Sequence, residues 1–254
     1  MSRLLSLLAF FMFTAAAVCV QSSEWSDNEI HYQKGDLDRA YRRGRDNTTT
    51  ITFQHASGWK YGATFLFIDH LSTQGNSDLY GEFYTTLSLA KISGKKTSIG
   101  PLSDIGVVFG VNVAADANVK KYLPGMSFSW EVPGFNFFTT LVTAYIDDSK
   151  GDVAPREGDS YMLDWSWDLP FQVGRHSFSV TGHMEYIHRR KNEFGATVES
   201  WLLSQPQLRY DLGKGLFKVP NHLFIGIEYQ YWHSKLGDKK TNENAAQILL
   251  VWKL

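Results

Sequence analysis

The sequence predicts an all-β chain that closes into an antiparallel transmembrane β-barrel of about twelve strands. Three observations predict this fold. Short runs rich in Tyr, Phe, Trp, Val, Ile and Thr recur along the chain, and aromatic residues make up 15% of it. Within most runs, apolar and polar residues alternate with the period of an extended strand. The connections between runs alternate between short and long, as they do in outer-membrane barrels.

Segments with strand character can be placed along the whole chain after the N-terminal apolar stretch. Each contains β-branched or aromatic residues and is bounded by Gly, Pro, Asn, Asp or Ser. The first of them is the least regular. The expected strands lie at 25–33, 47–56, 59–69, 79–90, 102–114, 122–132, 135–146, 160–170, 175–188, 198–212, 221–233 and 244–254.

The two faces of each strand differ in a way that indicates which solvent each face meets. On segment 221–233, Ile225 and Ile227 alternate with Glu228, and on segment 160–170, Trp165 alternates with Asp164. The polar faces hold Ser, Thr, Gln, Asn and single carboxylates, whereas the exposed face of a soluble sandwich is richer in Lys, Arg and Glu. Because hydrocarbon offers no partner to backbone amides, a sheet that spans it must close on itself. We therefore expect an apolar exterior and a hydrated lumen.

The connections predict the two ends of the barrel. We expect tight turns at Ser57 and Gly58, at Pro133 and Gly134, and at 171–174, and medium connections at 91–101 and 213–221. The remaining connections are charged and are expected to form long loops at the opposite end from both termini. These loops are predicted at 34–46, 71–78, 147–159, 189–195 and 234–244.

The N-terminus has the architecture of a secretory signal peptide, with one early Arg and an apolar core from Leu4 to Val18. We expect residues 1–22 to be removed, with a cut between Ala17 and Ser23, and residues 23–254 to form a single outer-membrane barrel domain. The chain has one cysteine, Cys19. Lipidation of Cys19 is disfavoured because Val18 replaces the small residue expected before it. The mature chain would then contain no disulfide.

Composition and spacing argue against several functions. A formal net charge of −1 gives no reason to expect nucleic acid as a partner. His183, Glu185 and His188 lie close in sequence, but on a strand His188 faces away from the other two, so we expect no metal site and no cofactor. A lipase-like site built from His183 with Ser179 or Ser166 is the weak enzymatic alternative, and we expect no catalytic residues.

Two stretches resemble the Tsx/OmpK family of nucleoside-specific channel-forming outer-membrane proteins: "SDLYGEFYTTLSLAKISGKKTSIGPLSDIGVVFGVNV" and "QPQLRYDLGKGLFKVPNHLFIGIEYQYWHSKLG". The likeness lies in the pattern of strands and turns over most of the mature chain, and not in a short catalytic motif. It implies a monomeric twelve-stranded barrel in the bacterial outer membrane, which passes nucleosides by passive diffusion and can serve as a receptor for phage or bacteriocins.

A nucleoside channel needs weak, multiple contacts from aromatic faces and hydrogen-bonding groups. The side chains on the polar parity of the strands are candidates for these contacts, or alternatively form an ion-paired network that braces the barrel. The candidates are Glu82, Tyr84, Glu131, Asp164, Asp168, Glu185, Gln205, Gln207, Arg209, Glu228 and Gln230.

Other functions remain open at the level of sequence. A structural or receptor barrel with a plugged interior would pass nothing through the membrane. A porin for another small solute would share the fold but not the selectivity. A secreted β-sandwich that binds glycans is the soluble alternative, and it would be extracted without detergent.

Overall fold

The structure is a computed structural model that describes residues 23–73, 75–95 and 98–254, and within these residues the chain forms one closed antiparallel sheet and one small two-stranded hairpin. β12 and β13 follow each other as two halves of one interrupted strand between β9 and β14, so the barrel has the expected twelve strands. The strands are β1 (Trp25–Asp38), β2 (Arg45–Trp59), β3 (Gly62–Thr73), β4 (Asn76–Ser88), β5 (Leu102–Ala114), β6 (Val119–Trp130), β7 (Phe137–Asp147), β8 (Ser160–Val173), β9 (His176–Ile187), β12 (Trp201–Ser204), β13 (Gln207–Asp211), β14 (Leu223–His233) and β15 (Glu243–Lys253).

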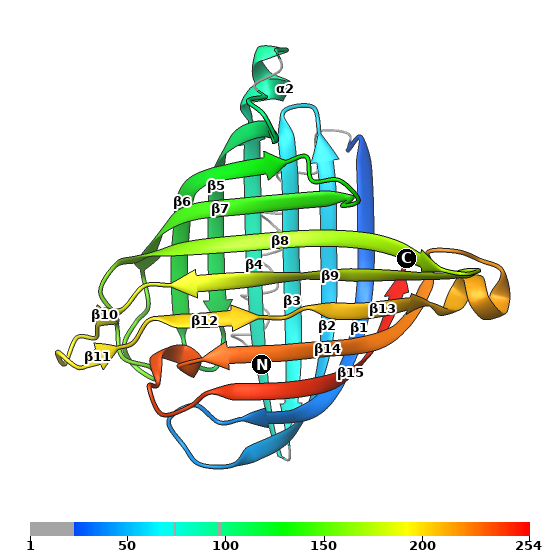
Figure 1. The fold of residues 1–254 in the computed structure, drawn as a ribbon. Helices are drawn as coiled ribbons and strands as arrows, with labels where there is room; N and C mark the ends of the chain where they lie inside the picture. The colour runs from blue at the N-terminus through cyan, green and yellow to red at the C-terminus, as the bar shows by residue number, and fades with distance from the viewer. Residues whose placement is uncertain (1–22, 74, 96–97) are drawn as a thin grey trace.

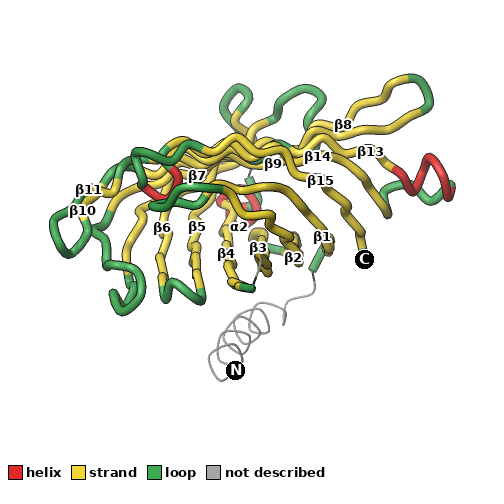
Figure 2. The backbone as a smooth tube through the Cα atoms, turned by 90° about the horizontal axis from the view of Figure 1, so that it is seen from below, coloured by secondary structure: helices red, strands yellow, loops and turns green. Residues whose placement is uncertain are grey.

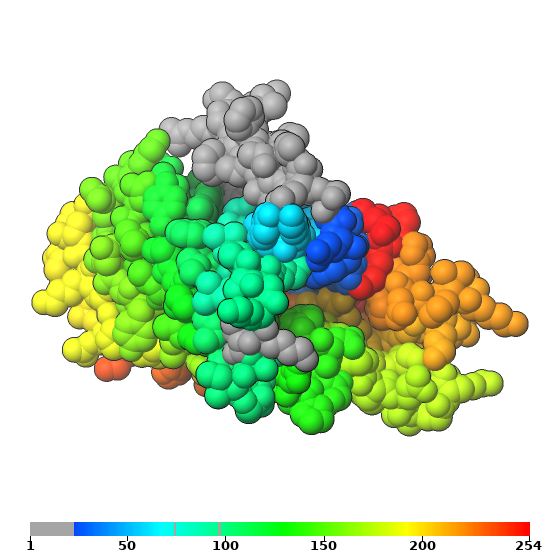
Figure 3. Space-filling model, turned by 90° about the horizontal axis from the view of Figure 1, so that it is seen from above, coloured from blue at the N-terminus to red at the C-terminus, as the bar shows by residue number. Residues whose placement is uncertain are grey.

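The first and last strands close the barrel. β1 pairs with β15 from Glu29 opposite Lys253 to Lys34 opposite Ile248. In the space-filling view the blue N-terminal strand lies directly against the red C-terminal strand (Figure 3). The strands of opposite walls cross one another, as β2 and β3 cross β8 and β9 in Figure 1, which is the arrangement that tilted barrel strands produce.

All twelve predicted strands are confirmed, and one of them is interrupted. Between Ser204 and Gln207 the strand loses its regular pairing, where Pro206 has no backbone N–H to donate. Gly182 of β9 faces this break, and a Cβ there would collide with the Gln205 carbonyl oxygen. The glycine therefore allows β9 to approach the irregular backbone closely.

Several predictions about connections are wrong. The turn expected at 171–174 lies at 174–175, because β8 continues to Val173, which pairs with His176. The strand β2 runs through Ser57 and Gly58 to Trp59, which pairs with Gly62, so the turn lies at 60–61. A Cβ on Gly58 would overlap the Trp25 indole, so this glycine makes room for a ring instead of making a turn. The predicted long loop at 71–78 is strand for most of its length, because Thr73 pairs with Asn76.

The barrel has two distinct ends. We call the end that carries Trp25 and Leu254 the terminus end; α2 (Leu89–Ser93) and the π-helical turn η1 (Gly213–Phe217) also lie there. The opposite end, called the loop end, carries the connections 39–44, 115–118, 148–159, 188–200 and 234–242. The last two contain the small hairpin β10 (Arg190–Lys191) and β11 (Thr197–Val198) and the short helix η2 (Lys235–Gly237). Figure 2 shows this hairpin far from the C-terminus, while β1 begins close to the C-terminus.

The difference in loop length between the ends is smaller than predicted, because several strands continue past the expected boundaries into hairpins at the loop end. β1 extends to Asp38, and β2 begins at Arg45, which leaves only 39–44 of the predicted loop 34–46. The signal peptide predicted for 1–22, with Cys19, lies outside the described residues.

The predicted faces are observed. The outward side chains of β14 and β15 are exposed to the surroundings, with Ile227 at 53%, Ile248 at 65% and Trp252 at 50%. Glu228 and Gln247, one residue away from these positions, are almost fully enclosed in the interior of the barrel. So much exposed apolar surface requires a nonaqueous surrounding. In the described part of the chain, none of the helices combines the length and the apolar character needed to cross a bilayer.

Candidate functional site

The interior of the barrel contains a cavity of about 1100 Å³. It begins at the terminus end, where Trp25, Gln172 and Lys253 line it, and extends to Glu82 and Glu228 in the middle of their strands. Its wall is built from the inward parity of nearly all strands, so the cavity is polar because the alternation puts the polar residues inside. Charged, amide, hydroxyl and aromatic side chains all contribute to the lining.

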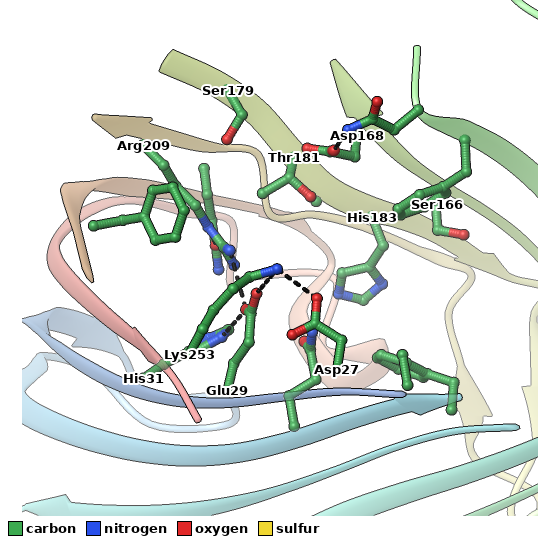
Figure 4. A pocket seen from close by; sticks show the side chains of 18 of the residues that line it. Asp27, Glu29, His31, Ser166, Asp168, Ser179, Thr181, His183, Arg209 and Lys253 are labelled. Carbon is green, nitrogen blue, oxygen red and sulfur yellow. Dashed lines mark hydrogen bonds and ion pairs between the residues drawn. The ribbon is translucent and has the colours of Figure 1, made fainter. Parts of the chain in front are cut away.

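A carboxylate with two cationic partners and a histidine beside it lies near the entrance. Glu29 Oε2 lies 2.7 Å from His31 Nε2 and accepts from Arg209 Nη1 at 3.0 Å. Glu29 Oε1 lies 3.2 Å from Lys253 Nζ, and this ammonium also binds Asp27. Figure 4 shows these side chains meeting inside the cavity, with His183, Ser166 and Asp168 on the opposite wall. Arg209 is a predicted candidate, whereas the partners on β1 were missed because the first strand has a weak alternation.

A second carboxylate, at the inner end of the cavity, is held by amides instead of cations. Glu228 Oε2 accepts from Gln33 at 2.5 Å and from Gln207 at 2.6 Å, and Glu228 Oε1 accepts from Gln247 at 2.9 Å. Gln205 donates to the same oxygen at a longer 3.3 Å. These amides come from different strands around the barrel, so Glu228 ties the walls together while it still lines the cavity.

The third polar group lies on β4 and β5. Glu82 accepts hydrogen bonds from the hydroxyls of Tyr80 and Tyr84, the latter at 2.9 Å, and from Asn112 Nδ2 at 2.9 Å. Two phenols and one amide therefore fix a single carboxylate. Glu82 and Tyr84 are both predicted candidates, and both line the cavity.

His183 lies on β9, between Asp164 of the neighbouring strand β8 and Gln205, which follows β12 on the other side. Its Nδ1 is 3.4 Å from Asp164 Oδ2, and its Nε2 is 2.7 Å from Gln205 Oε1. Both ring nitrogens of His183 are thus engaged by Asp164 and Gln205, and not by Ser166 or Ser179. The geometry gives no support to the Ser–His arrangement of a lipase. Among the residues described, no group of three or more His, Cys, Asp or Glu side chains is placed to hold a metal ion.

Aromatic rings line the same cavity. Phe65 and Phe67 face inward from β3 with ring centroids 6.1 Å apart, and Phe67 lies 5.9 Å from the Tyr80 ring. The neighbouring residue on this face, Asp69, accepts a hydrogen bond from Thr52 at 2.6 Å. Sequence parity could have identified these phenylalanines, since they share the parity of Asp69, but an apolar residue on a polar face does not stand out.

The predicted lumen residues lie in three places: outside the interior, inside the barrel but beyond the cavity, and along the cavity. Glu131 lies outside: it follows the last residue of β6 and is exposed in the connection. Glu185 and Gln230 point into the barrel but lie beyond the inner end of the cavity; Trp201 Nε1 donates to Glu185 at 3.2 Å, and Gln230 accepts from Gln205 at 2.9 Å. The remaining candidates line the cavity: Glu82, Tyr84, Asp164, Asp168, Gln205, Gln207, Arg209 and Glu228.

Beyond the cavity, toward the loop end, one side of the interior is filled with apolar side chains. We call this group the apolar plug. It packs residues from five strands, β6, β7, β8, β9 and β12, together with Val198 of β11, so the connection 188–200 folds inward and contributes to it. The plug consists of Leu123, Tyr145, Met162, Ile187, Val198 and Trp201, with Tyr84 and Trp232 packed against it.

Buried ion pairs lie beside the plug. Lys121 Nζ is 2.7 Å from Glu157 and 3.2 Å from Asp147, and Arg190 Nη2 is 2.6 Å from the same Glu157 carboxylate. The side chains of Lys121, Asp147 and Arg190 are at most 3% exposed. Glu157 belongs to the connection 148–159, so charges fix two connections to the barrel wall at once.

The connections of the loop end are hydrogen-bonded to one another. The amide of Tyr41 donates to Asp238 at 2.9 Å, which joins 39–44 to 234–242. The amide of Glu199 donates to the Gly237 carbonyl at 3.1 Å, which joins 234–242 to 188–200. The next links run from 188–200 to 148–159 through the Gly158 amide and the Lys191 carbonyl, and from 148–159 to 115–118 through Asn118 and Asp152. The connections of the loop end thus form one connected rim.

A second, smaller cavity of about 250 Å³ lies at the loop end. It is confined to the wall formed by β1 to β4 and the adjoining connections, on the side that the apolar plug leaves unfilled. Its lining includes Leu37, Thr48, Leu71, Asp78 and Lys235.

Comparison with known proteins agrees with the fold. No protein-family model matches the chain, and no curated protein sequence matches it at a significant level. Among solved structures, the NanC porin in a rhombohedral crystal form is 14% identical over 89% of this chain and 100% of its own, with a TM-score of 0.53. The KdgM porin is 9% identical over 89% of this chain and 99% of its own, with a TM-score of 0.50. At these identities the similarity concerns the fold, which is that of outer-membrane barrels.

Proposed function

We propose that the chain is an outer-membrane channel for the passive diffusion of small uncharged polar solutes, with nucleosides as its permeants. The observation that carries this proposal is the cavity of about 1100 Å³, polar and partly aromatic, inside a closed barrel with an apolar exterior. A barrel of this kind is stable only where lipid surrounds it, and the bacterial outer membrane is where such barrels occur. One chain closes its own sheet, so no second chain is needed to complete the barrel, and we propose that the channel is a monomer.

The lining supports nucleosides as the permeant class. Phe65 and Phe67 offer ring faces on which a base can stack, and Asp69 and Gln54 lie beside them as hydrogen-bonding groups. The polar residues of the lining are largely bonded to each other, so a passing solute meets weak and replaceable contacts. The resemblance of 77–113 and 205–237 to the Tsx/OmpK family points to the same permeants.

The orientation follows from the ends of the barrel. Outer-membrane barrels have both termini in the periplasm. The terminus end, where the large cavity begins, would then face the periplasm, and the hydrogen-bonded rim of the loop end would face the outside. Phage or bacteriocins would meet this rim.

Planar-bilayer recording tests the proposed function. The purified protein should form channels whose ionic current falls as adenosine is added, because a bound nucleoside occupies the lumen. Phe67→Leu should weaken this block, whereas Phe53→Leu, on the outward face of β2 where Phe53 is 39% exposed, should leave it unchanged. Channels that adenosine does not affect, but that pass other solutes in a liposome-swelling assay, would replace nucleosides by another solute class.

A second candidate function, a receptor barrel that passes nothing, is favoured by one observation. The apolar plug fills one side of the interior toward the loop end, and hydrogen bonds join the connections around that end. Such a barrel would present its rim to phage or bacteriocins without transport. Complete absence of conductance from correctly folded protein, together with retained phage or bacteriocin binding, would decide for this candidate.

A further inference from the structure

The two cavities are separated by one layer of residues along the wall of β1 to β4. On β2, Thr52 lines the large cavity, Thr48 lines the small one, and Thr50 is the inward residue between them. On β1 the intervening residue is Gly35. Adjacent inward residues of a strand are about 7 Å apart, so the partition has the thickness of a single side-chain layer.

The other two strands of this wall confirm how thin the partition is. On β4, Glu82 lines the large cavity and Asp78 the small one, with Tyr80 between them. On β3 no inward residue intervenes, since Asp69 lines the large cavity and Leu71, the next inward residue, lines the small one.

The opposite wall is closed over a much longer distance. On β7 the large cavity ends at Leu141, and the inward residues that follow, Thr143 and Tyr145, are 2% and 6% exposed. On β8 and β9 the next inward residues toward the loop end include Met162 and Ile187, both 1% exposed. None of these residues lines the small cavity. The apolar plug thus blocks this side with tightly packed side chains.

Of the residues that separate the two cavities, Gly35 has no side chain, and the ring of Tyr80 is held at the β5 side. A Cβ added to Gly35 would lie 2.7 Å from Gln247 Cγ, so the backbone of β1 is as close to Gln247 as a glycine permits. Tyr80 is the one large residue of the layer. Its hydroxyl donates to Glu82 and accepts from Asn112 Nδ2 at 3.2 Å, which turns the phenol toward β5 and away from β1.

From these positions we infer that solutes cross the barrel off its axis, along the wall of β1 to β4, and that Gly35, Thr50 and Tyr80 form the constriction between the two cavities. The apolar plug fixes the opposite side and conducts nothing. The small cavity is then the outer vestibule, with Asp38, Arg39 and Lys235 at its polar lining. This inference rests on the proposed channel function, for which it specifies the route.

Thiol labelling of two matched threonines tests the route. Thr50 and Thr143 are both inward, both buried at 6% and 2%, and each is the first inward residue beyond the large cavity on its own wall. The sequence has a single cysteine, Cys19, in the predicted signal peptide, so wild-type protein treated with reagent is the background control. The experiment records single-channel current of Thr50→Cys and Thr143→Cys before and after a charged methanethiosulfonate reagent.

The expected result is that the reagent lowers the current of Thr50→Cys by more than about half and leaves that of Thr143→Cys within the scatter of wild type, because only the first thiol lies on the route. Thr48→Cys, in the small cavity, should respond in the same way as Thr50→Cys and serves if the latter does not fold. Heat-modifiable gel mobility verifies that each variant has closed its barrel.

Other outcomes overturn the inference. Modification that blocks Thr143→Cys and spares Thr50→Cys would place the route through the apolar side. Equal responses, or no response of either cysteine in a conducting channel, would also refute a route along β1 to β4. If folded wild-type protein carries no current at all, the proposed channel function itself fails, and this result is distinct from a conducting channel with the wrong labelling pattern.

Discussion

Arg190 lies inside the barrel with its guanidinium carbon 4.4 Å from the centre of the Trp201 ring. The same guanidinium is 5.1 Å from the Tyr145 ring, and its Nε donates to Glu157 at 2.7 Å. Cation–π contacts are strongest where the cation has lost its water, as it has here. One side chain from a connection therefore holds two connections and two strands together at the loop end.

Removing this side chain should destabilise the protein. Arg190→Ala leaves Glu157 with Lys121 as a cationic partner and empties the space above Trp201. Breaking a buried ion pair from one side costs about 3–5 kcal/mol, and we expect a loss near the lower end because Lys121 stays. Urea unfolding in detergent measures it. Arg189→Ala, at the exposed neighbouring position, should change the free energy of unfolding by less than about 0.5 kcal/mol, and equal effects of the two variants would contradict the proposed role of Arg190.

Neutralising Glu29 should shift ion selectivity toward anions. Glu29→Gln removes one negative charge from the entrance and leaves Arg209 and Lys253 without their shared carboxylate. We expect the cation-to-anion permeability ratio to fall about twofold, since a narrow charged entrance focuses the field on passing ions. Reversal potentials in a salt gradient provide the measurement. Glu131→Gln, in the exposed connection outside the cavity, is the matched control, and a shift as large in this variant would show that the effect is not local to the lumen.

The contact between two connections of the rim should depend on pH. The Thr241 hydroxyl and the amides of Lys240 and Tyr41 donate to Asp238 and lower the pKa of its carboxyl below the ordinary 3.8. A lowered pKa means that the contact is intact above the pKa of the free side chain and is lost as the pH falls through the folded value. Acidification to that range should therefore break the Tyr41–Asp238 link between 39–44 and 234–242, while the hydrogen bond from the Tyr41 hydroxyl to the Leu236 carbonyl remains.

Asp238→Asn should weaken the same contact at neutral pH. Hydrogen exchange of the Tyr41 amide should become faster by up to about tenfold, which corresponds to the usual net free-energy contribution of one hydrogen bond. Asp36→Asn, whose carboxylate instead accepts from Asn47 at 2.8 Å, should leave the Tyr41 amide unchanged. An unchanged Tyr41 amide in Asp238→Asn would mean that this bond does not hold the rim together.

Lipid should contact the outward tryptophans and not the inward ones. Trp252 is 50% exposed on the outer face of β15, whereas Trp201 is 5% exposed within the apolar plug. In membranes that contain brominated lipids, wild-type tryptophan fluorescence should be partly quenched, and Trp252→Phe should remove a measurable part of that quenching. Trp201→Phe should remove none. The reverse pattern would mean that the apolar face points inward, as in a soluble sandwich.

The sequence allowed the faces of the strands to be predicted but not the connections between them. The alternation of Ile225 and Ile227 with Glu228 depends only on the geometry of a single strand, and it placed each of these side chains on the correct side of the barrel. The turn expected at Gly58 was wrong because a glycine can also serve close packing, here against Trp25. The residues around a glycine in the sequence do not show whether it makes a turn or makes room for a neighbouring side chain.

The partners inside the lumen depend on the closed barrel as a whole. Gln33 donates to Glu228 across 195 positions of sequence, and Arg209 binds Glu29 across 180. These pairs form because the stagger of twelve strands brings particular inward residues to the same height, and this stagger is set by every pairing around the barrel. The sequence by itself thus determined which side chains face lipid and which face inward, since that rule has a period of two residues. Only the tertiary structure decided which inward residues meet, where Leu123 and Met162 fill the lumen, and where space remains.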